Sequence, residues 1–332
     1  MFRMSIIGGS FRNRGSPIDG HKNPSMPLTP PHFRKGDLIA LISPASPPSS
    51  SEKVEGAVRY LENRGYAVEV GKHVLDVHGY LAGTDDARLE DLNGFIRNEK
   101  VKGIIAIRGG YGTPRLLQRV DYESLRKNPK VIVGYSDLTG LQNAIFSQTG
   151  LVTFSGPMAG VEMWEKIDPY TEEMFWRTVE NGRVGKLDNP REEPVSVLKG
   201  GTGEGVLIGG NFSLFMNLFG TPYLPDVNKA VLVLEDVDEA PHRIDRMLTQ
   251  LRNSGLLGKL SALIFGAFTD CGPSDPEKPY LSVEELQKEF AQYVNGPVMA
   301  NIRYGHIPRK MTLPIGGRVR VDGNRGTLEL LA

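Results

Sequence analysis

Residues 131–148 read VIVGYSDLTGLQNAIFSQ. Val131, Ile132 and Val133 form an apolar run typical of a buried strand, and residues 138–148 carry apolar side chains at helical spacing. Ser136 lies in the turn between the two elements. In parallel sheets, ligands gather where strands end in this way, so the stretch indicates both a fold class and a place to look for a site.

The alternation of strand and helix extends from this stretch towards the N-terminus. Apolar or alternating runs predict strands at 38–42, 66–70 and 101–107, and helical spacing predicts helices at 52–64, 84–97, 113–120 and 122–127. Alternating elements of this kind indicate a parallel sheet that helices cover on both faces. We therefore expect an α/β domain over residues 37–157.

Two further regions are expected after residue 157: a helical connector over residues 158–192 and a strand-rich α+β domain over residues 193–332. The second domain is predicted to contain helices at 242–253 and 282–292 and strands at 195–198, 205–209, 230–235, 262–265, 298–302, 318–321 and 327–331. Residues 1–36 are rich in Pro, Gly, Ser and basic side chains, which predicts a disordered N-terminal tail, or a true start at Met26.

The composition narrows the class of protein. The chain has 332 residues, with 39 basic and 39 acidic side chains. A net charge of zero gives no global field to attract nucleic acid or anionic lipid, so we expect neither as a partner. The single cysteine, Cys271, cannot form an internal disulfide, and a cytoplasmic location is the simplest interpretation.

The turn at Ser136 has half of the pattern of a nucleophile elbow. Gly134 and Ser136 fit the first part of G-x-S-x-G, but Leu138 occupies the position of the last glycine. An elbow would expose the serine hydroxyl and direct backbone N–H groups at an oxyanion. The alternative is that Ser136 or Asp137 is only a helix N-cap.

A nucleophilic serine needs a base and a carboxylate that orients it. Of six histidines, His306 is the best placed, because it follows an apolar strand and lies between Gly305 and a Pro- and Gly-rich stretch; a structural role is the alternative. Glu235 is the first polar residue after the apolar strand that starts at Ala230, so it needs a partner or has a task. An exposed acidic turn is the alternative there.

A glycine-rich segment, Arg108-Gly109-Gly110-Tyr111-Gly112, follows the third strand. Glycines at a strand end allow the backbone to approach a ligand closely. The segment matches neither a dinucleotide-binding fingerprint nor a P-loop, so an oxyanion donor or substrate loop fits better. The chain has neither H-E-x-x-H nor C-x-x-C, and we expect no metal and no cofactor.

Together these segments resemble the LD-carboxypeptidase family of serine peptidases, which includes muramoyltetrapeptide carboxypeptidases and microcin C immunity peptidases. The resemblance covers about residues 36–331 and rests on ordered matches at Gly36-Asp37, Ser43–Ser46, Tyr80–Asp85, Arg108–Gly112, Gly134–Thr139, Thr153–Met158, Gly209–Asn211, Gly220–Tyr223, Leu234–Asp236, Asp245-Arg246, Gly305-His306 and Leu313–Gly316. One departure is Ser155, where many relatives have histidine; we do not expect it to affect the catalytic residues.

The resemblance implies a flavodoxin-like first domain that carries the nucleophile and a second domain that carries its partners. By position, it implies Ser136 as nucleophile, His306 as general base and Glu235 as the carboxylate. The oxyanion hole would be the backbone N–H groups of Gly110 and Asp137. The implied reaction releases terminal D-Ala from a murein tetrapeptide through an acyl-enzyme, in the cytoplasm, and the family also implies a homodimer.

Two alternatives remain open at this point: a microcin C-type immunity peptidase that hydrolyses an aminoacyl-nucleotide amide, and a peptide-binding module without catalysis. A carboxypeptidase also has to bind a free carboxylate, for which a guanidinium is well suited. Arg108 and Arg115 are the nearest candidates in the sequence, with Tyr111 beside them. The alternative for both arginines is that they pair with surface acids.

Overall fold

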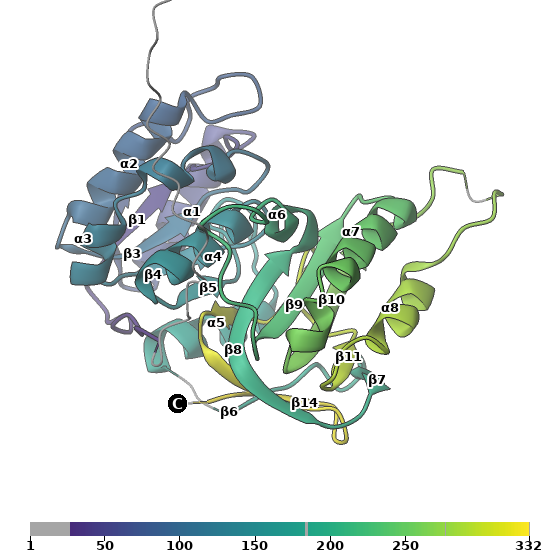
Figure 1. The fold of residues 1–332 in the computed structure, drawn as a ribbon. Helices are drawn as coiled ribbons and strands as arrows, with labels where there is room; N and C mark the ends of the chain where they lie inside the picture. The colour runs from purple at the N-terminus through teal and green to yellow at the C-terminus, as the bar shows by residue number, and fades with distance from the viewer. Residues whose placement is uncertain (1–26, 183–184, 276, 332) are drawn as a thin grey trace, which may run out of the picture.

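The first sheet contains six strands in the order β12-β5-β4-β3-β1-β2. In the computed structural model, which describes residues 27–182, 185–275 and 277–331, these strands are β1 (Leu38–Ile42), β2 (Ala67–Val70), β3 (Val101–Ala106), β4 (Val131–Gly134), β5 (Thr153–Ser155) and β12 (Leu313–Ile315). The strands β1 to β5 are parallel, and β12 is antiparallel to β5. The predicted parallel α/β sheet is confirmed (Figure 1).

Helices connect the parallel strands close to the predicted positions: α1 (Ser51–Asn63), α2 (Asp85–Arg97), α3 (Tyr122–Lys127) and α4 (Leu138–Thr149). One prediction differs in detail. Residues 113–120 form two short 3₁₀ turns, Thr113–Arg115 and Leu117–Arg119, instead of one helix. The first nine residues of α4 are all buried, because this helix lies between the two halves of the molecule.

The second sheet contains eight strands in the order β6-β14-β13-β8-β9-β10-β11-β7. They are β6 (Gly185–Leu187), β7 (Ser196–Lys199), β8 (Thr202–Asn211), β9 (Val231–Val237), β10 (Ala262–Thr269), β11 (Val298–Ala300), β13 (Arg318–Asp322) and β14 (Thr327–Leu330). The central strands β8 to β11 are parallel, and the flanking strands pair antiparallel. The strand-rich α+β prediction therefore holds, with a parallel centre that the sequence pattern did not indicate.

The remaining helices are α5 (Pro169–Asn181), α6 (Phe212–Met216), α7 (Pro241–Asn253) and α8 (Val283–Ala291), with a 3₁₀ turn at Leu257–Lys259. Figure 1 shows α7 and α8 side by side along one face of β9 and β10. The apolar face of α7, with Ile244, Leu248 and Leu251, packs into the same hydrophobic cluster as Leu263 and Phe265 of β10. This packing covers the second sheet on that face.

The N-terminal boundary of the fold lies earlier than the predicted residue 37. Leu28 forms an isolated parallel bridge with Leu151, and Phe33 is only 3% exposed. The Phe33 ring lies 6.5 Å from the Trp176 ring of α5, within one hydrophobic cluster. The tail prediction is therefore wrong for residues 27–36, where two apolar side chains anchor an extended segment that average composition does not reveal. The rest of the predicted tail, residues 1–26, lies outside the described residues.

Buried hydrogen bonds and one shared strand are among the connections between the halves of the molecule. Asn143 of α4 donates to the Gly209 carbonyl oxygen at 2.8 Å and accepts from the Gly209 N–H at 3.0 Å. The strand β12 comes from the C-terminal part of the chain and adds to the edge of the first sheet. Its position differs from the prediction that residues 193–332 form a separate domain. The halves are thus linked by buried hydrogen bonds and by a shared strand.

Candidate active site

Ser136 lies on a sharp turn between β4 and α4. Its φ angle is 63°, in the left-handed region that non-glycine residues rarely adopt. Side chains pack closely around two glycines here: a Cβ on Gly109 would lie 2.9 Å from Ser136 Cβ, and a Cβ on Gly134 would lie 2.3 Å from Leu138 Cδ2. A side chain at Gly109 would collide with Ser136 itself, and the half-buried serine is held in the strained geometry typical of a nucleophile elbow.

The glycine-rich segment is attached to this turn through Asp137. The Asp137 carboxylate accepts hydrogen bonds from the N–H groups of Gly112, at 3.1 Å, and Thr113, at 2.8 Å. The Thr113 hydroxyl donates to the Asp137 carbonyl oxygen at 2.6 Å. Burial raises the pKa of Asp137 to about 6. These three hydrogen bonds fix the loop and the serine turn relative to each other.

Two backbone N–H groups near Ser136 are available to an oxyanion. Over the part of the chain that the structure describes, neither the Gly110 N–H nor the Asp137 N–H donates to a protein acceptor. Gly110 has a φ of 102°, and a Cβ there would lie 2.2 Å from Ser46 Oγ. Ser46 Oγ in turn accepts from the Tyr111 N–H at 3.2 Å, which helps to fix the loop.

His306 and Glu235 are hydrogen-bonded to each other. His306 Nδ1 lies 2.8 Å from Glu235 Oε2, and the Glu235 side chain is completely buried. A Cβ on Gly305 would lie 2.6 Å from Glu235 Oε2, so the glycine allows the backbone to pass the carboxylate. The Thr269 hydroxyl donates to the His306 carbonyl oxygen at 3.0 Å. Because Nδ1 is engaged, Nε2 is the ring nitrogen left for proton transfer.

The serine turn and the histidine loop are in contact through Tyr135. The Tyr135 and His306 rings have centroids 5.0 Å apart and meet at an angle of 64°. Tyr135 directly precedes Ser136, so this contact places the serine turn beside the imidazole. The structure thus joins His306 to Glu235 and places the residue before Ser136 against the imidazole.

The strand that carries Glu235, β9, is also connected to α4, the helix that follows Ser136, through the neighbouring strand β8. Asn211 of β8 is the register partner of Glu235 in β9. The Asn211 N–H donates to Thr139 Oγ1, in the first turn of α4, at 2.9 Å. Asn211 also donates through its side chain to Asp236 Oδ1 at 2.9 Å. Ordinary strand pairing and one hydrogen bond therefore connect the carboxylate to the helix that follows the nucleophile.

A buried ion pair beside Tyr135 was not predicted from the sequence. Lys310 Nζ lies 2.6 Å from Glu162 Oε1 and 3.9 Å from the centroid of the Tyr135 ring. The Tyr135 hydroxyl donates to the same Glu162 oxygen at 2.8 Å. The Lys310 side chain is 3% exposed and that of Glu162 is 11% exposed. The one feature of the sequence that could have indicated this pair is the position of Lys310, four residues after His306. Glu162 lies in the predicted connector, and nothing in the sequence around it indicates a role.

A cavity of about 600 Å³ opens next to His306. It is lined by Tyr135, by Val161, Glu162 and residues 166–169, and by residues 306–308 together with Lys310. The cavity is therefore bounded by the candidate base and by the connector between the two sheets.

The three candidate substrate residues do not line this cavity. Arg115 is paired with Asp85, through Nε at 2.9 Å and through Nη2 at 3.0 Å. Arg108 is exposed and donates to the Pro47 carbonyl oxygen at 3.0 Å. The exposed Tyr111 ring lies 5.8 Å from the Tyr80 ring. Arg115 therefore pairs with an acidic side chain, which was the alternative to a role in substrate binding.

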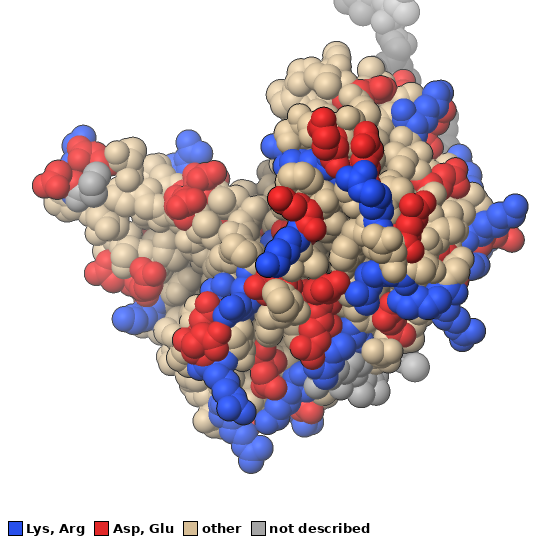
Figure 2. All heavy atoms as spheres, turned by 180° about the vertical axis from the view of Figure 1, so that it is seen from behind, with Lys and Arg blue, Asp and Glu red and all other residues tan. Residues whose placement is uncertain are grey.

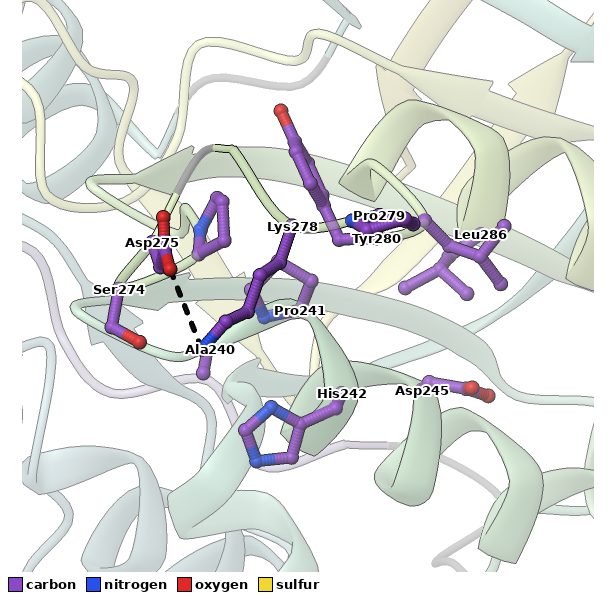
Figure 3. A pocket seen from close by; sticks show the side chains of 12 residues that line it. Ala240, Pro241, His242, Asp245, Ser274, Asp275, Lys278, Pro279, Tyr280 and Leu286 are labelled. Carbon is purple, nitrogen blue, oxygen red and sulfur yellow. Dashed lines mark ion pairs between the residues drawn. The ribbon is translucent and has the colours of Figure 1, made fainter.

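A second pocket lies between the start of α7 and residues 273–281, and Figure 3 shows it from close by. Lys278 is paired there with Asp275 at 3.4 Å, and His242 is among the lining residues. None of Ser136, Glu235 and His306 lines it. The pocket is therefore separate from the candidate active site.

The charges on the surface, the membrane-spanning capacity of the helices and the possible metal ligands can be compared with the expectations from composition. On the face drawn in Figure 2, basic and acidic side chains are interspersed. Among the described helices, none has the length and apolar character needed to cross a bilayer. Residues 27–331, apart from the gaps at 183–184 and 276, contain no cluster of three His, Cys, Asp or Glu side chains that could hold a metal ion.

Two sequence families match the chain, one over each half. The LD-carboxypeptidase N-terminal domain matches residues 39–156, and the LD-carboxypeptidase C-terminal domain matches residues 204–321. The first match contains Ser136, and the second contains Glu235 and His306.

Individual relatives cover nearly the whole chain. A probable murein peptide carboxypeptidase of Bacillus subtilis is 36% identical, over 90% of this chain and 92% of its own. The murein tetrapeptide carboxypeptidase of Pseudomonas aeruginosa is 34% identical, over 86% and 94%. The crystal structure of an MccF-like protein from Bacillus anthracis is 28% identical, covers 92% and 99% of the two chains and superposes with a TM-score of 0.79. The chain belongs to the LD-carboxypeptidase family and is a serine-type carboxypeptidase.

Proposed function

We propose that the chain removes the terminal D-amino acid from a murein tetrapeptide, with Ser136 as nucleophile, His306 as general base and Glu235 as the carboxylate that orients it. The observation that carries the proposal is the 2.8 Å bond between His306 Nδ1 and buried Glu235, next to the strained turn of Ser136. A nucleophile, a base and a group that orients the base are the components of acyl transfer.

The reaction proceeds in two halves. As Ser136 Oγ bonds to the carbonyl carbon at the L-centre, His306 Nε2 takes the hydroxyl proton. The carbon–nitrogen bond then breaks, and His306 passes the proton to the leaving amine of D-Ala. In the second half, His306 takes a proton from a water molecule that attacks the acyl-enzyme carbonyl. The bond between that carbon and Ser136 Oγ then breaks, and His306 returns the proton to Ser136 Oγ as the tripeptide leaves. Throughout, Glu235 fixes the imidazole tautomer and stabilises its charged form.

The oxyanion of both tetrahedral intermediates is assigned to the Gly110 and Asp137 N–H groups. Each donor of this kind contributes on the order of 10²–10³ in rate. The Asp137 side chain supports the assignment, because it ties the loop of Gly110 to the turn that carries the second donor.

The deciding experiment compares D-Ala release from a muramoyl tetrapeptide by the wild type, Ser136→Ala and His306→Ala. Ser147→Ala, on the same helix as the nucleophile turn, and His242→Ala, in the pocket of Figure 3, are matched controls that should retain full activity. Equal release by Ser136→Ala and the wild type would falsify the proposal. Intact mass after reaction with a serine-reactive probe separates a peptidase, which is labelled at Ser136, from a binding module, which is not.

A second candidate is cleavage of an aminoacyl-nucleotide amide, the reaction that the resemblance to microcin C immunity peptidases implies, and the likeness to an MccF-like structure favours it. MccF itself is the microcin C7 self-immunity protein of Escherichia coli. The murein reaction is preferred because the Bacillus subtilis and Pseudomonas aeruginosa relatives, at 36% and 34% identity, both carry murein names. Parallel assays with a tetrapeptide and an aminoacyl-nucleotide amide distinguish the two. The homodimer and the cytoplasmic location remain predictions.

A further inference from the structure

The proposed mechanism fixes the side on which the leaving group lies. His306 donates its proton to the nitrogen of the departing D-amino acid, so that residue lies on the imidazole side of the scissile bond. Its α-carboxylate is one carbon away from the same nitrogen. A group that binds this carboxylate therefore has to line the space next to His306.

Among the described residues, the cavity beside His306 meets this requirement, since His306 and Lys166 both line it. Its volume of about 600 Å³ is within the usual range for small-molecule sites. Ile167, Pro169, Ile307 and Pro308 contribute apolar surface to its walls. Such walls suit a small apolar side chain such as the methyl group of D-Ala.

Apart from His306, four charged side chains line the cavity, and three of them are engaged. Glu162 and Lys310 form the buried ion pair described above. Asp168 caps α5, accepting from the N–H groups of Tyr170 at 3.0 Å and Thr171 at 3.2 Å. Among the described residues, Lys166 is paired with no carboxylate, and its side chain is exposed. Lys166 is therefore the cation available to a ligand.

We propose that this cavity binds the leaving D-amino acid and that Lys166 binds its free carboxylate. The proposal rests on the proposed function and deepens it, because it explains how the site selects a chain end. An internal peptide bond has no carboxylate at this position and cannot engage Lys166. The arginines of the glycine-rich segment are not needed for this role, since Arg115 is paired with Asp85.

The test uses two substrates, a tetrapeptide that ends in D-Ala and the same peptide ending in D-alaninamide. For the acid, Lys166→Met should lower kcat/KM about 10- to 100-fold, as expected for one charge-assisted contact, and leave the amide unchanged. Lys166→Arg should recover most of the loss. Lys278→Met, in the pocket of Figure 3, should change neither substrate. An equal loss on acid and amide, or a loss on the acid in Arg108→Met instead, overturns the proposal.

A binding measurement separates failure of this inference from failure of the proposed function. Calorimetry with Ser136→Ala measures affinity for both peptides in the absence of turnover. Weaker binding of the acid alone in Ser136→Ala/Lys166→Met supports the subsite, even if the wild type releases no D-Ala and the proposed reaction fails. Unchanged binding, or no binding of either peptide, overturns it.

Discussion

Asn143 and Gly209 hydrogen-bond each other in both directions, side-chain amide to backbone, across the interface between the serine helix and the second sheet. Both residues are buried. The pair acts as a fixed joint between α4, which follows the nucleophile turn, and β8, which pairs with the strand of Glu235. It therefore links the two elements next to those that carry Ser136 and Glu235.

Asn143→Ala should therefore destabilise the protein by about 2–4 kcal/mol, because the buried N–H and carbonyl groups of Gly209 lose their partners. Urea denaturation measures this free energy of unfolding. Ser147→Ala, one turn further along α4, is the matched control and should change it by less than about 0.5 kcal/mol. A loss in Asn143→Ala as small as that of the control would contradict the role assigned to the joint.

Glu235→Gln should lower kcat by about 10³–10⁴ with little change in KM, because the amide neither stabilises the imidazolium nor selects the correct tautomer. Steady-state D-Ala release measures both constants. Glu239→Gln is the control: Glu239 lies just beyond the same strand and faces Arg243 at 3.7 Å. A decrease in kcat of less than tenfold in Glu235→Gln would be inconsistent with the proposed role.

Asp137 should give the protein an unusual pH dependence. Burial raises its folded-state pKa to about 6 from the ordinary 3.8, so folding favours the protonated form. As pH rises from about 4 to about 6, the wild type should lose stability relative to Asp137→Asn, by up to about 3 kcal/mol, and the difference should stay constant at higher pH.

Denaturation at a series of pH values measures this effect. Glu123→Gln is a control of opposite sign, since the hydrogen bond from Lys127 lowers the pKa of Glu123. In that comparison, the stability of the wild type relative to Glu123→Gln should increase as pH rises. A flat difference between the wild type and Asp137→Asn over pH 4–7 would argue against a raised pKa.

Lys310→Met should cost about 3–5 kcal/mol of stability, because it leaves the buried Glu162 carboxylate without a counter-ion. The double variant Glu162→Gln/Lys310→Met should recover part of this loss. Lys127→Met, which breaks an exposed pair of the same 2.6 Å length, should cost less than about 1 kcal/mol. Equal losses of stability in the two lysine variants would show that the buried pair contributes no more than an exposed one.

The features predicted correctly are mainly local in the chain. The strand, turn and helix around Ser136 are encoded within residues 131–149, and the apolar runs of the parallel strands are just as local. The role of His306 stays a prediction, and it too rests on immediate neighbours, a strand before the histidine and a glycine beside it. The family resemblance then linked these separate segments into one site.

The features missed depend on contacts between distant residues. Glu162 and Lys310 are 148 positions apart, and neither has a motif that indicates the other. The strand β12 is only three residues long and contains Pro314, so its sequence does not stand out as a strand. Phe33 packs against Trp176 of α5, which composition over residues 1–36 could not indicate.

The position of β12 has a consequence for how the molecule comes apart. Leu313–Ile315 completes the edge of a sheet whose other strands all come from the first 155 residues. An N-terminal fragment that ends after β5 would leave the edge of the sheet at β5 exposed. The remaining C-terminal fragment would contain β12 without the strand that it pairs with. The two halves should thus unfold as one cooperative unit. Co-expressed fragments should regain activity only if β12 of the C-terminal fragment pairs again with β5 of the N-terminal fragment.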